Sequence, residues 1–201
     1  MFRFCRSGGV LLLPGQGMAA LASAYVDTLA IEKIQGRDLG LVARRQIASG
    51  EVFFCERPIV KVTHANGGYR AKFSGDEAAG QSQLLSLAQN SKVTSNGEIA
   101  WDEVARAICP SAHGTQQTAI ANALNTNTFL AHRVGARESV TFLTISRINH
   151  SCQPNCELRI SLEPSELGAV KAIRSVAPGE ELTINCNNGG LVEPVRMRLL
   201  L

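Results

Sequence analysis

The sequence has 201 residues, of which 45% are apolar and 18% are charged, and its formal net charge is only +3. This composition favours a folded core over wholesale disorder, and the length suggests one domain with room for an insertion. The charge is nearly balanced and forms no dense basic stripe, so we expect no direct binding of nucleic acid. No apolar run approaches the about 20 residues of a membrane span, so we expect no membrane partner.

Residues 1–20 contain Arg3 and Arg6 but no acidic residue, and they are rich in Leu, Ala and Gly. Such a segment is typical of a mitochondrial presequence; a secretory signal or an unstructured start are the alternatives. The six cysteines include no CxxC pair and do not resemble a compact zinc module. We therefore expect no metal site and reduced thiols in an intracellular protein of the cytoplasm or nucleus, or of the mitochondrion if residues 1–20 are a presequence.

From residue 25 onward the chain becomes β-prone. Apolar and alternating stretches predict strands over 25–34, 41–43, 51–56 and 59–63. Residues 67–80 are polar and contain glycine, and no element is expected there. Helical spacing then predicts helices over 81–89, 98–108 and 116–124, which suggests a helical insertion over about 75–125. Strands return after Asn127, over 156–162, 169–173 and 181–185, and a last helix is expected from residue 195.

Residues 149–155 read NHSCQPN, a string of polar groups, a thiol and a proline. A strand is rarely built this way, whereas a loop whose side chains form hydrogen bonds can be. His150 within this string could be a general base, a metal ligand or a structural histidine. The string by itself leaves these three roles open.

Three strings follow one another along the chain: GRDLGLVARRQIASGE over 36–51, RINHSCQPNC over 147–156 and APGEELTINC over 177–186. In their amino-acid sequence and in their order along the chain, they resemble the SET domain, the fold of most protein-lysine methyltransferases. The resemblance covers 30–58 and about 125–201. Residues 127–129 and 145–150 further resemble the SMYD-like branch, although residues 59–126 lack the dense Cys/His cluster of its MYND zinc module. We therefore expect a SET domain over 25–201 without a MYND module.

The resemblance implies a β-rich α+β fold of small curved sheets with a helical insertion. A threaded C-terminal segment of that fold would bring residues 149–150 beside the strand over 181–186. The implied methyl donor is S-adenosylmethionine, and the implied partner is a lysine-bearing protein, histone or not. Arg37 and the Gly40-Leu41 turn would approach the donor's methionine end, Asn127 and Asn149 would hydrogen-bond its amino or carboxylate groups, and His150 would hold the adenine and ribose side, mostly through its backbone. Taken without the resemblance, Asn127 could be a helix-end residue and Arg37 a solvated surface charge.

Two departures from the family pattern concern catalysis. Cys186 stands where most active SET domains place a tyrosine, and a thiol does not reproduce the reach or hydrogen-bond geometry of a phenol. In the SMYD-like branch, a Cys-rich post-SET region also takes one zinc ligand from the position of Cys152. No such region precedes Leu201, so we expect Cys152 to be a buried thiol. Either the sequence is a fragment or the protein has lost its post-SET part, and the ending over 199–201 favours a truncated gene model. Two hypotheses follow: an S-adenosylmethionine-dependent protein-lysine methyltransferase, or a catalytically weak or inactive SET module that binds a protein partner.

Overall fold

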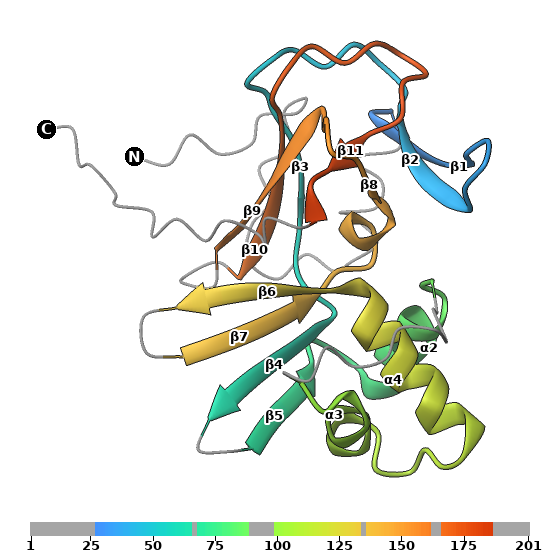
Figure 1. Cartoon of the computed structure of the whole chain (residues 1–201), viewed down its shortest axis with the longest axis vertical. Coiled ribbons are helices and arrows are strands. Elements are labelled where there is room, and N and C mark those ends of the chain that lie inside the picture. The colour runs from blue at the N-terminus through green and yellow to red at the C-terminus, as the bar shows by residue number, and fades with distance from the viewer. Residues whose placement is uncertain (1–26, 66–67, 89–98, 134–135, 162–165, 187–201) are drawn as a thin grey trace, which may run out of the picture.

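The computed structural model describes residues 27–65, 68–88, 99–133, 136–161 and 166–186 (Figure 1). The segment over 1–20 and the helix expected from residue 195 lie outside these ranges. In the described ranges the chain forms eleven short strands in four small sheets, three α-helices and one 3-10 helix. The expected β-rich fold of small sheets is thus confirmed.

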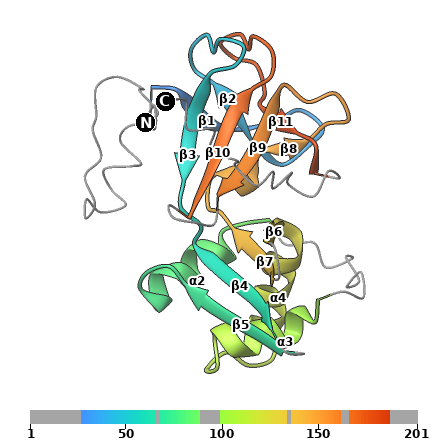
Figure 2. The ribbon, with the colours of Figure 1, turned by 90° about the vertical axis from the view of Figure 1, so that its left-hand side faces the viewer.

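One part of the molecule, residues 27–57 together with 142–161 and 166–186, is called the β lobe (Figure 2). It contains the hairpin β1 (Leu29–Lys33) and β2 (Leu39–Ala43), and an antiparallel sheet of β3 (Val52–Glu56), β10 (Leu167–Ala172) and β9 (Cys156–Ser161). Its third sheet is the parallel pair β8 (Asn149–His150) and β11 (Thr183–Ile184). The three sheets enclose one apolar core in which Phe53, Phe142 and Leu182 are almost fully buried.

The other part, residues 58–65, 68–88, 99–133 and 136–141, is called the helical lobe. Its antiparallel sheet has the order β5 (Gly68–Phe73), β4 (Val60–Ala65), β7 (Ala136–Thr141), β6 (Thr128–Arg133). The helices α2 (Glu77–Leu85), α3 (Trp101–Ile108) and α4 (Thr115–Asn127) enclose a second apolar core with this sheet. None of the helices that the structure describes is long and apolar enough to cross a membrane.

Strand β5 occupies part of the segment 67–80, where no element was expected, so that expectation was wrong. Its residues Tyr69, Ala71 and Phe73 alternate with exposed neighbours and pack against the second core. The intervening residues are a glycine and two cations, so the segment carries the two-residue alternation of a half-buried strand. The strand gains its stability from pairing along its whole length with β4, a contact that local sequence patterns do not report.

Two chain segments connect the lobes, 56–60 and 142–148 (Figure 2). The second contains the 3-10 helix η1 (Ile145–Arg147). The carboxylate of Glu56, at the end of β3, accepts the backbone N–H groups of Thr144 and Ile145, each at 2.9 Å. Burial raises the pKa of Glu56 despite these bonds. The Glu56 carboxylate therefore links the two connecting segments to each other, close to β8, the strand that carries Asn149.

Candidate functional site

The parallel pair β8–β11 brings two of the three sequence strings together. Asn149 pairs with Thr183 and His150 with Ile184, and the N–H of Ser151 donates to the Ile184 carbonyl at 2.9 Å. The expected placement of residues 149–150 beside the segment 181–186 is therefore confirmed. The buried side chain of Ile184 anchors the pair in the β-lobe core.

The third string joins them through β2. The N–H of Leu182 donates to the carbonyl of Leu41 at 2.8 Å, and Val42 forms a β-bridge with Glu181. The side chain of Leu41 is 1% exposed and lies in the β-lobe core. Leu41 therefore borders the candidate site with its backbone, while its side chain is structural.

Four residues from the three strings meet at one point. The Asn149 amide donates from Nδ2 to Oε1 of Glu181 at 2.8 Å, and the guanidinium of Arg37 lies 3.5 Å from the same Oε1. A Cβ atom on Gly40 would come within 2.7 Å of Asn149 Nδ2 and 3.2 Å of Glu181 Oε1, closer than atoms normally pack. The same Cβ would lie 2.6 Å from Cγ1 of Ile34, so a side chain at position 40 would crowd Ile34, Asn149 and Glu181.

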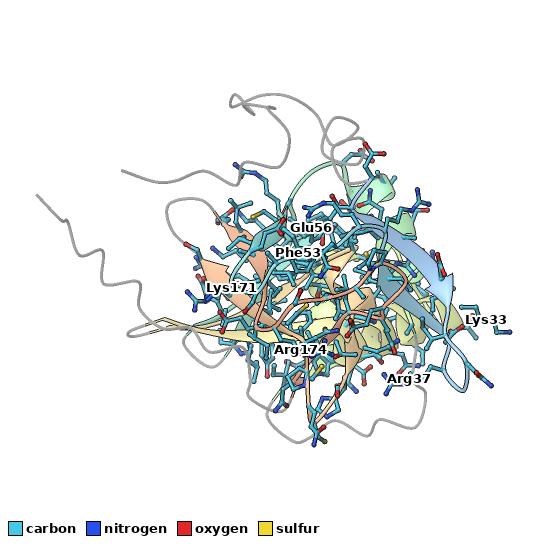
Figure 3. All side chains as sticks on the ribbon, turned by 90° about the horizontal axis from the view of Figure 1, so that it is seen from above. Lys33, Arg37, Phe53, Glu56, Lys171 and Arg174 are labelled. Carbon is cyan, nitrogen blue, oxygen red and sulfur yellow. The ribbon has the colours of Figure 1, made fainter. Side chains whose placement is uncertain are left out.

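Arg37 also binds the main chain of the candidate site. Its Nη1 donates to the carbonyl oxygen of His150 at 3.1 Å. Figure 3 shows Arg37 on the side of the molecule formed by β1 and β2, near Lys33 and away from Lys171. Its side chain is 43% exposed, so the guanidinium keeps room for a further anionic group.

The imidazole ring of His150 is held from both sides. Nδ1 accepts the backbone N–H of Cys186 at 3.1 Å, and Nε2 lies 3.5 Å from the sulfur of Cys152. Because Nδ1 is an acceptor here, a neutral ring carries its proton on Nε2, facing that sulfur. These contacts make the ring a structural connection between the residue 150–152 loop and Cys186.

Cys152 was expected to be buried, and this expectation was wrong, because the residue is exposed. It follows β8 in a loop whose turn directs the thiol toward the His150 ring instead of the core. The five cysteines that the structure describes form no disulfide with one another. Among all the residues that the structure describes, no group of three or more Cys, His, Asp or Glu side chains could hold a metal ion.

Cys186 lies two residues after the end of β11, and its backbone N–H contacts His150. The residue is exposed as a whole, but partial burial of the thiol raises its pKa. At neutral pH the group is therefore a neutral thiol, a weak hydrogen-bond donor without the negative charge of a nucleophile or base.

Asn127, the last residue of α4, is held by the helical lobe. Its Nδ2 donates to the carbonyls of Ala88 and Ala123, both at 2.7 Å, and its own carbonyl accepts the Ser146 hydroxyl at 3.0 Å. Both amide hydrogens are thus used inside the protein. Its hydrogen bonds go to Ala88, Ala123 and Ser146, and none of these is a candidate donor-binding residue, so the role expected for it from the family pattern stays a prediction.

Asn155 and Glu181 are residues to which sequence reasoning assigned no role. Asn155 is 1% exposed; its Oδ1 accepts the N–H of Thr183 at 2.8 Å and its Nδ2 donates to the Glu181 carbonyl at 2.7 Å. It thereby fixes the β11 segment beside the 149–155 loop. Both residues lie inside the three strings described above. The signal that could have found them is a polar residue next to a short strand, because a buried polar group needs a hydrogen-bond partner.

A family model described as the SET domain matches residues 38–187. Among solved structures, a chain of apo ctPRC2 with mutations in Ezh2 shares 15% identity over 81% of this chain and 15% of that chain, with a TM-score of 0.44. A Plasmodium falciparum protein described as a proposed histone methyltransferase shares 14% identity over 79% of this chain and 92% of that chain, with a TM-score of 0.38. No curated protein matches the sequence. Since the family model spans most of the chain, this protein belongs to the SET domain family.

Proposed function

We propose that this protein is an S-adenosylmethionine-dependent methyltransferase that acts on a lysine side chain of a protein substrate, histone or other. The observation that carries the proposal is the meeting of Arg37, Gly40, Asn149 and Glu181 beside the β8–β11 pair. We further propose that the protein belongs to the SMYD-like branch of the family, because the sequence of residues 127–129 and 145–150 resembles that branch.

The residues present fit the amino-acid end of this methyl donor, which carries a carboxylate and an ammonium group. The half-exposed guanidinium of Arg37 can bind the carboxylate, and the side-chain oxygen of Asn149 can accept from the ammonium. Gly40 lacks the Cβ atom that would crowd Asn149 and Glu181, so these two side chains can meet beside Arg37. His150 would contribute main-chain groups to the adenosine side. The Asn127 amide, whose two hydrogens are engaged, fits such a role less well.

The donor, when bound, supplies a methyl group on a positively charged sulfur, which a neutral lysine amine can displace directly. The contribution of the chain is alignment of the amine and electrostatic complementarity to the reacting groups. Cys186 would stand beside the amine, but as a neutral thiol it orients the amine less well than a phenol and does not accept its proton.

Cys186 is also the specific observation that favours the second candidate function, a SET module that binds a protein partner with little or no methyl transfer. Replacing Cys186 with tyrosine distinguishes the two. In a weakened enzyme, Cys186→Tyr should raise methyl transfer, whereas in a binding module it should leave transfer at background.

The direct test is calorimetric titration of the full chain with S-adenosylmethionine, followed by transfer of a labelled methyl group to lysine-bearing proteins. Binding with transfer would support the methyltransferase, and binding without transfer would support the binding module. No binding by the folded chain would contradict the proposed donor site. Gly40→Ala is the matched negative variant, because its Cβ would displace Asn149.

A further inference from the structure

The side-chain amide of Asn149 has one orientation that its surroundings allow. Nδ2 faces two oxygen atoms, Oε1 of Glu181 at 2.8 Å and the carbonyl of Leu39 at 3.4 Å. A carboxylate and a main-chain carbonyl accept hydrogen bonds and donate none. If the amide were turned over, three oxygen atoms would face one another. The NH₂ group must therefore point toward Glu181, and Oδ1 must point to the opposite side.

Glu181 is itself held in place by its main chain. Its carbonyl accepts Nδ2 of the buried Asn155 at 2.7 Å, and its backbone bridges to Val42 of β2. Its side chain, 23% exposed, lies between Asn149 and Arg37. One carboxylate thus contacts both side chains that we assign to the donor's amino-acid end, and no step of the proposed transfer uses it.

We propose that Glu181 is a positioning residue that fixes the Asn149 amide with Oδ1 presented as an acceptor and holds the Arg37 guanidinium beside it. The pair then offers an acceptor to an ammonium and a cation to a carboxylate, so the site selects a ligand that ends in a free α-amino acid. The identity of the ligand rests on the proposed function, but the orientation of the amide does not.

Without the Glu181 carboxylate, the Asn149 amide can turn over, because the Leu39 carbonyl is a distant acceptor at 3.4 Å. The turned amide presents NH₂ to the ammonium, and two donors then face each other. Loss of one such hydrogen bond corresponds to about tenfold in affinity. The loss applies to ligands that carry the amino-acid end and spares those that lack it.

The first experiment needs no ligand. In the full chain, the two ¹⁵N-coupled amide protons of Asn149, assigned by their disappearance in Asn149→Ser, should exchange slowly with solvent. Glu181→Gln keeps an acceptor oxygen and should preserve this protection, whereas Glu181→Ala should remove it. Equal protection in wild type and Glu181→Ala would overturn the proposal.

The second experiment compares two ligands by calorimetry: S-adenosylmethionine, and 5′-methylthioadenosine, which lacks the amino-acid end. Glu181→Ala should weaken S-adenosylmethionine binding about tenfold and leave 5′-methylthioadenosine binding unchanged. Glu181→Gln should restore most of the affinity. Glu51→Ala is the matched control, since that carboxylate pairs with Arg45 at 2.7 Å and contacts none of the site residues named above.

An equal loss for both ligands in Glu181→Ala would overturn the proposal, because it would indicate a general structural defect. A loss in Glu181→Gln as large as in Glu181→Ala would also overturn it, since charge and not the acceptor would then matter. If wild type binds 5′-methylthioadenosine but not S-adenosylmethionine, the selectivity claim fails. If wild type binds neither ligand, the proposed function fails, and the amide measurement still decides whether Glu181 orients Asn149.

Discussion

The two lobes of the molecule are stabilised in different ways. The helical lobe has a regular four-stranded sheet and three helices that share an apolar core. The β lobe has two two-stranded sheets and one three-stranded sheet around its core, and a two-stranded sheet is marginal without other support. Side chains of Glu56, Asn149 and Asn155 provide that support by hydrogen-bonding the backbone of neighbouring segments. The candidate site lies among these bonds, so the residues that shape it are also the residues that stabilise its surroundings.

The largest effect is expected at Phe142, where the chain enters the β lobe from β7. Its side chain is fully buried, and its ring would lie 2.6 Å from a Cβ on Gly168. Phe142→Ala should lower the free energy of unfolding by about 4 kcal/mol, because it leaves a cavity in the β-lobe core. Urea denaturation measures this change, with Phe142→Leu as the milder control. A cost below about 1 kcal/mol would show that this core does not hold the lobe together.

Ile120, fully buried in α4, is the corresponding residue of the helical lobe. Ile120→Ala should cost about 3 kcal/mol of unfolding free energy. In the remaining folded protein, the affinity for S-adenosylmethionine should stay as in wild type, because Arg37, Gly40 and Asn149 lie in the β lobe and outside this core. Weakened binding by the folded variant would show that the helical lobe takes part in the site. It would then favour the predicted contact of Asn127 with the donor.

Glu56 tests the connection between the lobes. Glu56→Ala leaves the N–H groups of Thr144 and Ile145 without their acceptor and should cost about 2 kcal/mol. The pH dependence has a definite sign, because burial raises the folded-state pKa of Glu56 above its ordinary value of 4.5. The folded state then binds the proton more tightly, so this group lowers stability as the pH rises from 4.5 through the folded-state pKa.

Glu56→Gln is the matched control for that titration. It keeps the shape and one acceptor but has no ionisable group, so its denaturation midpoint should lack the decline that Glu56 contributes to wild type over this pH interval. Identical pH profiles for wild type and Glu56→Gln would mean that the Glu56 carboxyl titrates as it does in the unfolded chain.

Elements with a strong local pattern were predictable from sequence. The helices over 98–108 and 116–124 and the strand over 51–56 occur close to their expected bounds as α3, α4 and β3. The juxtaposition of residues 149–150 with 181–186 followed from a family resemblance and not from any local pattern. Strand β5 was missed although its residues alternate between apolar and polar, because its segment was interpreted as polar and glycine-containing. The exposure of Cys152 was missed because it depends on tertiary neighbours.

The residues of the candidate site divide in the same way, into those with a signal in the sequence and those without one. Arg37, Gly40 and Asn149 were named from the strings that carry them, and the structure brings them together. Glu181 was not named, since a glutamate beside a turn most often faces solvent. Its contact with Asn149 joins residues 32 positions apart, and hydrogen bonds of that range are set by the fold.

The smallest effect is expected at Glu166, whose carboxylate accepts from the ammonium of Lys61 at 3.0 Å and thereby links the start of β10 to β4 of the other lobe. The Lys61 hydrogen bond lowers the pKa of Glu166 below its ordinary value of 4.5, so the pair stabilises the fold above pH 4.5 and is lost as the pH falls through the folded-state pKa. Because the Glu166 side chain is 39% exposed, solvent screens the pair, and Glu166→Gln should cost only about 0.5 kcal/mol.

Glu166 is a better residue than Lys61 to change as a test of this ion pair, because Lys61 also lies 3.5 Å from the buried carboxylate of Glu138. Removing Lys61 would leave Glu138 without that cation, which costs far more than one exposed ion pair. The difference between wild type and Glu166→Gln should vanish in acid and shrink in high salt. A difference that persists under both conditions would mean that the shape of the Glu166 side chain, and not its charge, holds the two lobes at this contact.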